Sequence, residues 1–423
     1  NDALQRFFND FPNFYRHHSP MTSSVLEKIE MAPKDPILGV TEAYVADTNP
    51  KKVNLGVGVY TDDDGKVPVL QCVRRAEQQL AEKPLPRNYL PIDGLAAYDR
   101  AVQETLFGAD SAAVKAGRIV TVQTLGGTGA LKVGGDFLRR LNPGAAIHIS
   151  DPSWENHRAI YEYAGFTVKT YPYYDAETHG LNFDAMIAGL EQLPAGDIVL
   201  LHACCHNPTG VDLTAAQWEK VIAVVNKRKL VPFLDLAYQG FADGLEADAQ
   251  TVRRFTAECP AVFVSSSFSK SLSLYGERVG ALSIVTSSKE EAARTLSQLK
   301  RVIRTNYSNP PTHGGQAVSL VLTTPELRAQ WDQELGQMRD RIKVMRKQLV
   351  DKIRERRSDF NLDFIVQQRG MFSYSGLTKA QVHKLREQYS IYAIDSGRIC
   401  VAALNSKNID YVADAIARVL VEG

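Results

Sequence analysis

A lysine follows an apolar and then serine-rich stretch in the segment Ser265-Ser-Ser-Phe-Ser-Lys270, and Arg278 stands close behind it. Removal from water and a nearby cation both lower the pKa of an amine, which favours nucleophilic or imine chemistry. Serine hydroxyls in the same segment can donate hydrogen bonds to phosphate oxygens. A solvated surface lysine is the alternative, but the apolar run before Lys270 argues against it. We therefore interpret Lys270 as a reactive lysine beside an anion site.

A glycine-rich segment, Gly126-Gly-Thr-Gly129, stands between a predicted strand and a predicted helix. Small residues let backbone N–H groups approach an anion, and the start of a helix favours negative charge. The segment therefore fits a phosphate cradle, although by itself it fits a tight strand-to-helix turn better. It lacks the third glycine of the dinucleotide-binding fingerprint and the lysine of the P-loop, so a nucleotide-binding dehydrogenase is not expected.

The segment Asp235-Leu-Ala-Tyr238 places an acid at the end of an apolar strand. A carboxylate buried there needs a cation or a strong hydrogen-bond donor as its partner. A protonated ring nitrogen of a cofactor would be such a partner, and a structural salt bridge is the alternative.

The segment Cys204-Cys-His-Asn-Pro-Thr-Gly210 follows another buried strand. Its Asn-Pro pair signals a turn in which a cis bond is possible. Asn207 would then present its amide to a crevice, and a purely turn-forming role is equally compatible with the pattern. His202 and His206 are four residues apart but straddle the end of a strand rather than share a helix face, so we expect no metal site.

Elements that position these residues alternate along the middle of the chain. Strands separated by helices predict crossover connections and a mostly parallel sheet, that is, an α/β fold. Ligands of such sheets bind at the carboxyl ends of the strands, which is where all four segments lie. The predicted strands cover residues 118–122, 146–149, 197–202, 231–235, 261–264 and 279–285, and the first predicted helix covers 131–141.

Two helix starts are well marked, and the second leads out of the predicted sheet domain. Thr214-Ala-Ala-Gln217 fits a capping box. Thr324-Pro325 begins an apolar stripe that continues to Ile353, and a helix of that length usually connects two domains. Short predicted strands at 364–366, 371–374, 391–394 and 398–401, with two helices, indicate a smaller α+β domain.

These patterns predict a domain organisation. A large domain would cover residues 67–337, and the smaller domain would combine residues 21–66 with 338–423. Residues 1–20 would be an N-terminal extension or an added segment before a native start at Met21.

Composition excludes several classes of function. Lys+Arg is 49 and Asp+Glu is 48, so a net charge of +1 offers no basic surface for nucleic acid. No apolar run reaches membrane-spanning length. The five cysteines show neither metal-ligand spacing nor a disulfide framework, which favours a reducing compartment, the cytoplasm.

Taken together, a reactive lysine, a buried acid, a phosphate cradle and hydroxyl or amide donors form the set that pyridoxal phosphate requires. The lysine serves as the imine partner, the acid holds the protonated ring nitrogen, and the remaining groups anchor the phosphate. The combination is far more specific than any of its parts.

The sequence also resembles a known family, the class I aspartate and aromatic-amino-acid aminotransferases, which are pyridoxal-phosphate enzymes of fold type I. The resemblance runs from about Ala32-Pro-Lys-Asp-Pro-Ile-Leu38 to the C-terminus and so covers nearly the whole chain. It implies a mostly parallel seven-stranded sheet sandwiched by helices, with a smaller α+β domain. The matching stretches include 54–60, 88–94, 151–157, 267–278 and 303–311.

The resemblance implies a role for each matching residue around the cofactor. Lys270 would hold it as an imine and move a proton between the substrate Cα and the cofactor C4′, with Asp235 keeping the pyridine nitrogen protonated. Tyr238 and Asn207 would bond the ring O3′. Trp154 would stack on the ring, and His157 and His202 would support the site. The phosphate would be held by Gly127, Thr128, Ser267, Ser269 and Arg278.

The substrate contacts and the assembly are implied in the same way. Arg398 would grip the α-carboxylate with its bidentate guanidinium, and Gly58 would belong to a mobile lid. Arg304 would reach a side-chain carboxylate from the second subunit of a homodimer, and Tyr89 of that subunit would touch the phosphate. Without the resemblance, both arginines would be taken as ordinary surface or ion-pairing residues, Trp154 as plain core and Gly58 as a turn glycine.

The expected substrates are aromatic and acidic L-amino acids with 2-oxoglutarate as acceptor. Arg304 fits dicarboxylates, whereas Pro91, Cys204-Cys205 and Leu274-Tyr-Gly276 are closer to the aromatic branch. A strict aspartate aminotransferase is the main alternative. Two arginines that could hold a dicarboxylate argue against a lyase or decarboxylase with the same cofactor. A catalytically silent regulator would be expected to carry a DNA-binding domain, and no additional segment is long enough to form one.

Overall fold

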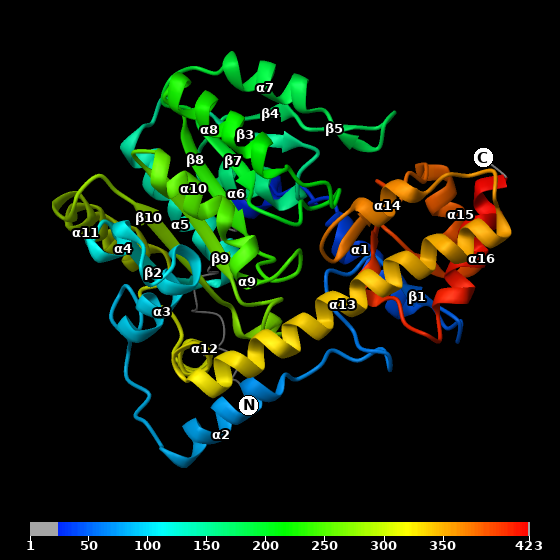
Figure 1. Cartoon of the computed structure of the whole chain (residues 1–423), viewed down its shortest axis with the longest axis horizontal. Coiled ribbons are helices and arrows are strands. Elements are labelled where there is room, and N and C mark those ends of the chain that lie inside the picture. The colour runs from blue at the N-terminus through cyan, green and yellow to red at the C-terminus, as the bar shows by residue number, and fades with distance from the viewer. Residues whose placement is uncertain (1–23, 422–423) are drawn as a thin grey trace, which may run out of the picture.

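The computed structural model describes residues 24–421, and its centre is a seven-stranded sheet (Figure 1). All six predicted strands are present, which confirms the α/β class. The seventh, β4, was not predicted, because most of its side chains face solvent at the sheet edge and its apolar pattern is weak. In spatial order the strands are β2 (Ile119–Leu125), β10 (Val279–Val285), β9 (Val262–Ser267), β8 (Val231–Leu236), β7 (Ile198–His202), β3 (Ile147–Asp151) and β4 (Val168–Pro172).

Strand β10 runs antiparallel to both of its neighbours, while the other pairings are parallel. Its register places Val279 opposite Leu125 and Gly280 opposite Ser267. The first residue of β10 therefore lies at the edge where β2 and β9 end. Arg278, which directly precedes β10, joins the residues that follow the parallel strands.

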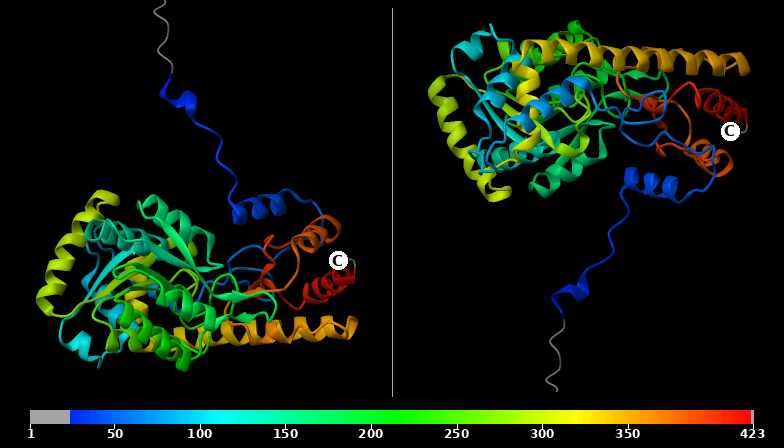
Figure 2. Two further views of the ribbon diagram at one scale, coloured as in Figure 1. Left: turned by 90° about the horizontal axis from the view of Figure 1, so that it is seen from above. Right: turned by 90° about the horizontal axis from the view of Figure 1, so that it is seen from below.

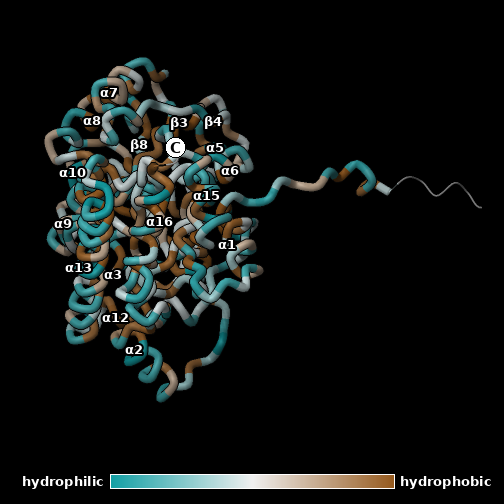
Figure 3. Tube along the Cα trace, turned by 90° about the vertical axis from the view of Figure 1, so that its right-hand side faces the viewer, coloured by the Kyte–Doolittle hydropathy of each residue, from teal (hydrophilic) through white to brown (hydrophobic). Residues whose placement is uncertain are grey.

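The sheet is buried on both faces, as its continuous apolar strands require. Alternate residues of β7 show this: Ile198 and Leu200 belong to one apolar cluster, and Val199 and Leu201 belong to the other. Figure 3 shows apolar colour along the inner strands, whereas the outer helices alternate between polar and apolar residues. Each face is therefore closed by helices that present one apolar side.

Helices cover the two faces in separate groups. On one face pack α5 (Gly126–Leu141), α6 (Glu155–Tyr163) and α11 (Lys289–Asn306). On the other pack α3 (Ala96–Phe107), α8 (Ala215–Arg228), α10 (Gln250–Glu258) and α12 (His313–Thr323), with α2 (Gln71–Glu82) outside α12. Shorter elements complete this part: α4 (Ala112–Lys115), α7 (Phe183–Glu191), α9 (Leu245–Asp248), β5 (Tyr174–Asp175), β6 (Gly180–Leu181) and the 3₁₀ turn η2 (Tyr275–Glu277).

Both predicted helix starts are confirmed. The capping box before α8 is complete, since Gln217 N donates to Thr214 Oγ1 at 3.2 Å and Thr214 N donates to Gln217 Oε1 at 2.8 Å. The long helix is α13 (Pro325–Arg356), with its proline in the first turn. It runs from the sheet region into a second, smaller group of elements (Figure 1).

The smaller group contains α14 (Asp363–Gln367), β11 (Phe372–Tyr374), α15 (Lys379–Tyr389), β12 (Ile391–Tyr392), β13 (Arg398–Cys400), the turn η3 (Val401–Ala403) and α16 (Ile409–Val421). The prediction of a strand at 364–366 was wrong, because those residues form α14. A run of three apolar residues fits either structure, and here Ile365 turns inward on a helix with no strand beside it.

The N-terminal part of the described chain returns to this smaller group. The turn η1 (Val25–Lys28) and the residues up to 35 extend away from the body (Figure 2). Helix α1 (Pro36–Ala46) begins at Asp35, whose Oδ1 accepts from Leu38 N at 2.8 Å. Strand β1 (Val53–Asn54) pairs in parallel with β12. The prediction for residues 1–20 lies outside the described residues.

Two general properties complete the description. Within residues 24–421, no helix combines the length and the apolar character needed to cross a bilayer. All five cysteines are buried free thiols.

Candidate active site

A cavity of about 190 Å³ lies at the edge of the sheet where the parallel strands end. It collects side chains that follow β2, β3, β7, β8 and β9, together with Arg278 before β10 and residues of the smaller group. Most of the predicted site residues meet in it: Gly58, Gly127, Thr128, Trp154, Asn207, Asp235, Tyr238, Ser267, Ser269, Lys270, Arg278 and Arg398.

Lys270 lies in the turn after β9, with its amine 5.3 Å from the centre of the Tyr238 ring. Burial, opposed by Asp235 and reinforced by Arg278, lowers the pKa of Lys270 to about 8. A substantial fraction of this amine is therefore neutral near physiological pH, as nucleophilic or base chemistry requires.

Asp235 lies at the end of β8 and is buried. Its Oδ2 is 2.8 Å from His157 Nε2, and no hydrogen-bond partner of its Oδ1 is found among the residues described. Burial by itself would raise the pKa of Asp235, but the hydrogen bond and charge of His157, with a contribution from Lys270, hold it below its usual value. The acid is therefore ionised, with one oxygen left for a cationic partner.

His157 is held in turn by its neighbours. Its Nδ1 is 2.9 Å from Ser153 Oγ, which is also 3.2 Å from His202 Nε2. Burial lowers the pKa of His202 to about 3, so this ring is neutral. His157 therefore contacts Asp235 directly, whereas His202 reaches it only through Ser153 and His157.

The glycine-rich segment is the first turn of α5, one turn earlier than the predicted helix start. Gly126 has a φ of +67°, and a Cβ there would lie 2.7 Å from Arg278 Nη2. Only glycine lets the guanidinium approach the start of this helix so closely. The unpaired N–H groups of the turn thus face the same cavity as the arginine.

The hydroxyl groups of two serines lie beside Arg278 and the first turn of α5. Ser269 N donates to Ser267 Oγ at 3.2 Å, and Arg278 Nη1 donates to Ser269 Oγ at 3.4 Å. Together with the start of α5, they form a concave set of donors suited to a phosphate group.

Arg398 is a buried guanidinium on the opposite wall. It donates from Nη1 to Asn207 Oδ1 at 3.3 Å and from Nη2 to the Gly56 carbonyl at 2.7 Å, while its Nε has no partner among the described residues. Its guanidinium carbon lies 4.2 Å from the centre of the Phe372 ring. Among residues 24–421 no carboxylate lies within ion-pair distance of it, so this arginine is available to an anionic ligand. Asn207 belongs to a turn in which the Asn207–Pro208 bond is cis.

Trp154 stands at the start of α6, where its ring meets His157 edge to face at a centroid distance of 5.1 Å. This contact fixes the indole beside the group that supports Asp235. The indole is only partly buried and lines the cavity, so it offers a face to a ring bound there.

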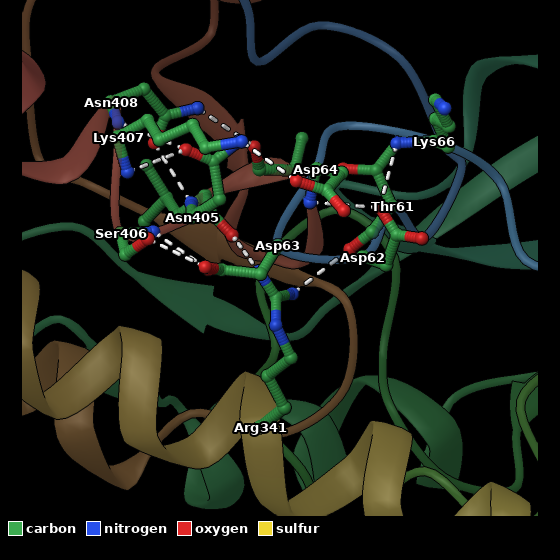
Figure 4. Close-up of polar contacts among 12 residues, drawn as sticks. Thr61, Asp62, Asp63, Asp64, Lys66, Arg341, Asn405, Ser406, Lys407 and Asn408 are labelled. Atoms are coloured by element: carbon green, nitrogen blue, oxygen red, sulfur yellow. Dashed lines mark hydrogen bonds and ion pairs between the residues drawn. The ribbon is translucent and has the colours of Figure 1, made fainter.

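The segment that carries Gly58 continues to Thr61 and Asp63, and polar contacts hold these two residues in place (Figure 4). Arg341 on α13 donates to the carbonyls of Thr61 and Leu404, each at 2.9 Å. Asp63 accepts from Ser406 N at 2.8 Å and from Ser406 Oγ at 2.5 Å. The segment that carries Gly58 is thereby tied to α13 and to the loop after β13.

Two predicted residues lie outside the cavity. Tyr89 is 91% exposed, and Arg304, near the end of α11, is exposed and donates to Ser308 in the turn that follows the helix. Within one chain, therefore, neither residue takes part in the site.

Some cavity residues were not predicted, namely Ile37, Leu131, Cys204, Ala237 and Phe372. Ile37 belongs to a stretch that matches the aminotransferase family, and Phe372 belongs to the predicted strand 371–374. Their apolar side chains carried no chemical signal, so only the contact with polar site residues identifies them.

The residues present fit pyridoxal phosphate. A ring nitrogen would meet the free oxygen of Asp235, a phosphate would meet the glycine turn with Arg278, and an aldehyde would meet the buried amine of Lys270. A lysine-centred cofactor site at the strand ends of an α/β sheet is thus the class of site that fold and geometry define.

The chain belongs to the family described as aminotransferase class I and II, which matches residues 50–416. It is 58% identical to the aspartate aminotransferase of Pseudomonas aeruginosa over 94% of this chain and 100% of that protein.

Solved structures agree with this assignment. The aromatic-amino-acid aminotransferase of Burkholderia pseudomallei, crystallised covalently bound to pyridoxal phosphate, has 65% identity and a TM-score of 0.92, covering 94% of this chain and 100% of that chain. An aromatic amino acid aminotransferase of Psychrobacter sp. B6, cocrystallised with aspartic acid, has 49% identity and a TM-score of 0.92, covering 93% and 99%.

Proposed function

We propose that this protein transfers amino groups between aromatic or acidic L-amino acids and 2-oxoglutarate, with pyridoxal 5'-phosphate as its cofactor. The observation that carries the proposal is the meeting of Lys270, Asp235 and Arg398 in one cavity, although they come from three separate stretches of the chain. An amine, an acid and a free guanidinium are the groups that transamination of an amino acid requires.

When bound, pyridoxal phosphate supplies an electron-poor ring that stabilises the negative charge left on the substrate Cα. Asp235 keeps the ring nitrogen protonated, and His157 keeps Asp235 ionised. With the cofactor in place, the amine of Lys270 would move the proton between the substrate Cα and the cofactor C4′. Its pKa of about 8 suits both directions of this transfer near neutral pH.

The remaining residues bind and orient. The phosphate would be held by Gly127 and Thr128 in the first turn of α5 together with Ser267, Ser269 and Arg278, and Trp154 would cover the ring. Tyr238 and Asn207 hold the ring hydroxyl. Arg398 binds the α-carboxylate of every substrate, because its buried guanidinium has no carboxylate within ion-pair distance among residues 24–421.

The protein works as a homodimer with shared sites. Within one chain Arg304 and Tyr89 are exposed and away from the cavity, which suits residues that complete the site of a second copy. Arg304 would then meet the side-chain carboxylate of aspartate or 2-oxoglutarate, and Tyr89 would meet the phosphate.

Within the described chain, we assign residues 67–337 to a large domain and residues 36–66 with 338–421 to a small one, while residues 24–35 extend away from both. The pairing of β1 with β12 and the passage of α13 between both groups support this division. The free thiols suit the reducing cytoplasm.

A substrate panel tests the proposal. Purified protein with pyridoxal phosphate and 2-oxoglutarate should convert aspartate, tyrosine and phenylalanine. Conversion of aspartate alone would establish the alternative, a strict aspartate aminotransferase. Release of products without a need for a 2-oxo acid acceptor would instead indicate a lyase and refute the proposal.

A further inference from the structure

Arg346 is a second buried guanidinium, on α13 and only 3% exposed. Its Nε donates to Ser373 Oγ at 3.1 Å, and its Nη2 donates to the carbonyls of Gly370 at 2.5 Å and Phe372 at 3.2 Å. All of these acceptors belong to β11 or the residues just before it. Arg346 therefore ties one short strand to the long helix.

Burying the charged guanidinium of Arg346 costs free energy that an apolar side chain at this position would not cost. Among residues 24–421, no carboxylate lies within ion-pair distance of Arg346, and burial lowers its pKa to about 10. The side chain is still charged at neutral pH. A buried charge held by neutral acceptors is usually less stabilising than an apolar side chain of similar volume. A functional role for strand β11, which Arg346 holds, would explain why a charged residue is buried here.

The strand carries Phe372, whose ring supports the cavity wall. The ring lies under the guanidinium of Arg398, with 4.2 Å from the guanidinium carbon to the ring centre. The same ring lies 5.9 Å from the ring of Tyr238, edge to face, and a Cβ at Gly58 would come within 3.2 Å of it. A shift of β11 would thus move the surface on which Arg398 rests.

One polar contact of Arg398, that with Asn207, also leads to the residues just before β11. The turn that carries Asn207 ends at Gly210, whose carbonyl accepts from Arg369 N at 2.7 Å, directly before Gly370. Just after that turn, Asp212 accepts from the backbone N–H groups of Cys205 and His206 at 2.7 and 2.9 Å. The charge of Asp212 also stabilises that of Arg346. Arg346 therefore lies where the supports of Arg398 converge.

We propose that Arg346 is a positioning residue for recognition of the substrate α-carboxylate: it holds β11 so that Phe372 fixes the guanidinium of Arg398. The inference rests on the carboxylate-binding role proposed for Arg398. Arg346 touches neither the substrate nor the cofactor, so its effect falls on substrate binding and leaves the proton transfer at Lys270 unchanged.

The test replaces the charge and keeps the side-chain volume. In the holoenzyme, Arg346→Met should raise KM for both aspartate and phenylalanine about tenfold while kcat stays within about twofold. The affinity for pyridoxal phosphate and the absorbance of the holoenzyme should not change. Arg346→Lys, which retains a donor, should recover part of the loss.

A matched control lies on the same helix. Arg328 is another arginine of α13; it is partly buried and donates to Thr105 Oγ1 at 2.8 Å, away from the cavity. Arg328→Met should leave both KM values unchanged. An Arg346→Met effect no larger than that of Arg328→Met would overturn the inference.

A double-mutant cycle separates this role from general damage. Phe372→Leu should by itself raise KM about tenfold, and adding Arg346→Met should then add less than about twofold, because both changes act through the same ring. Independent, multiplying effects would contradict the inference. If Arg346→Met fails to fold, Ser373→Ala and Arg346→Lys carry the same comparison with Phe372→Leu.

A binding measurement distinguishes failure of this inference from failure of the proposed function. Calorimetric titration of the holoenzyme with 3-phenylpropanoate, a carboxylate that cannot be transaminated, should show weaker binding in Arg346→Met and unchanged binding in Arg328→Met. Equal binding by all three proteins would refute the inference while leaving transamination intact. An inactive wild type that still shows the difference would refute only the proposed function.

Discussion

The Nε2 of His157 lies 2.8 Å from Oδ2 of Asp235, and both side chains are buried. The contact occupies one carboxylate oxygen and turns the other toward the cavity. It also keeps the pKa of Asp235 below its usual value although burial acts in the opposite direction. An ionised acid aimed at a ring-sized cavity is the feature that separates this site from an ordinary buried salt bridge.

Asp235→Ala should slow transamination by about 10²- to 10³-fold, because the ring nitrogen loses the charge that keeps it protonated. Lys270 remains in place, so the protein should still show the visible absorbance of bound pyridoxal phosphate. Steady-state kinetics and absorbance spectra check both parts. Activity within about tenfold of wild type would contradict the role of Asp235.

Lys270→Ala should abolish transamination and the absorbance change on adding pyridoxal phosphate, since the only amine in the turn after β9 is removed. Lys227→Ala, at an exposed lysine in the last turn of α8, serves as the control and should behave as wild type. Retained turnover in the Lys270 variant would remove the proposed mechanism.

Arg398→Ala should raise KM for every amino acid substrate, because each carries an α-carboxylate. The loss of a charge-assisted, bidentate contact is expected to cost about 2 kcal/mol or more, roughly thirtyfold in kcat/KM. Kinetics with aspartate and phenylalanine give the comparison. A defect limited to dicarboxylates would assign Arg398 to the side chain instead.

Arg304→Ala should lower kcat/KM for aspartate about a hundredfold and for phenylalanine less than about threefold, because only aspartate has a second carboxylate to bind. Arg301→Ala, at an exposed position one turn earlier on α11, is the matched control. Equal losses on the two substrates would refute the distal role of Arg304.

The depressed pKa of Lys270 predicts a pH dependence of stability in the cofactor-free protein. Between the folded-state pKa of about 8 and the ordinary value of 10.5, only the unfolded chain binds the proton, so stability rises with pH in this window. Below about pH 8, Lys270 is protonated in the folded protein as well, and its buried charge destabilises the fold.

Lys270→Met removes this titration. Its free energy of unfolding, compared with that of wild type, should fall by about 2 kcal/mol between about pH 7.5 and about pH 9.5. Urea unfolding of both cofactor-free proteins at each pH measures the difference. A constant difference would show that the amine is not desolvated in the folded protein.

Much of the fold followed from local patterns. The strands that are buried on both faces read as short apolar runs, and the capping box before α8 and the proline start of α13 were each visible in a few residues. The edge strand β4 and the helix α14 were missed or misassigned, because their apolar residues are too few to fix a period.

The chemistry of the candidate site could likewise be predicted from local patterns. Lysine, aspartate, glycine and serine types at predicted strand ends were enough to predict a cofactor with a phosphate and an aldehyde, because parallel strands bring their carboxyl ends to one edge.

What the sequence by itself determined was the chemistry available: which groups ionise, which donate, and which stretches are apolar enough to become strands. The tertiary structure alone decided the antiparallel direction of β10, which brings Arg278 to the glycine turn, and the pairing of His157 with Asp235. It also decided that Arg346 holds the strand under Arg398. These relationships join residues far apart in the chain, and such contacts depend on how elements pack, which no local pattern records.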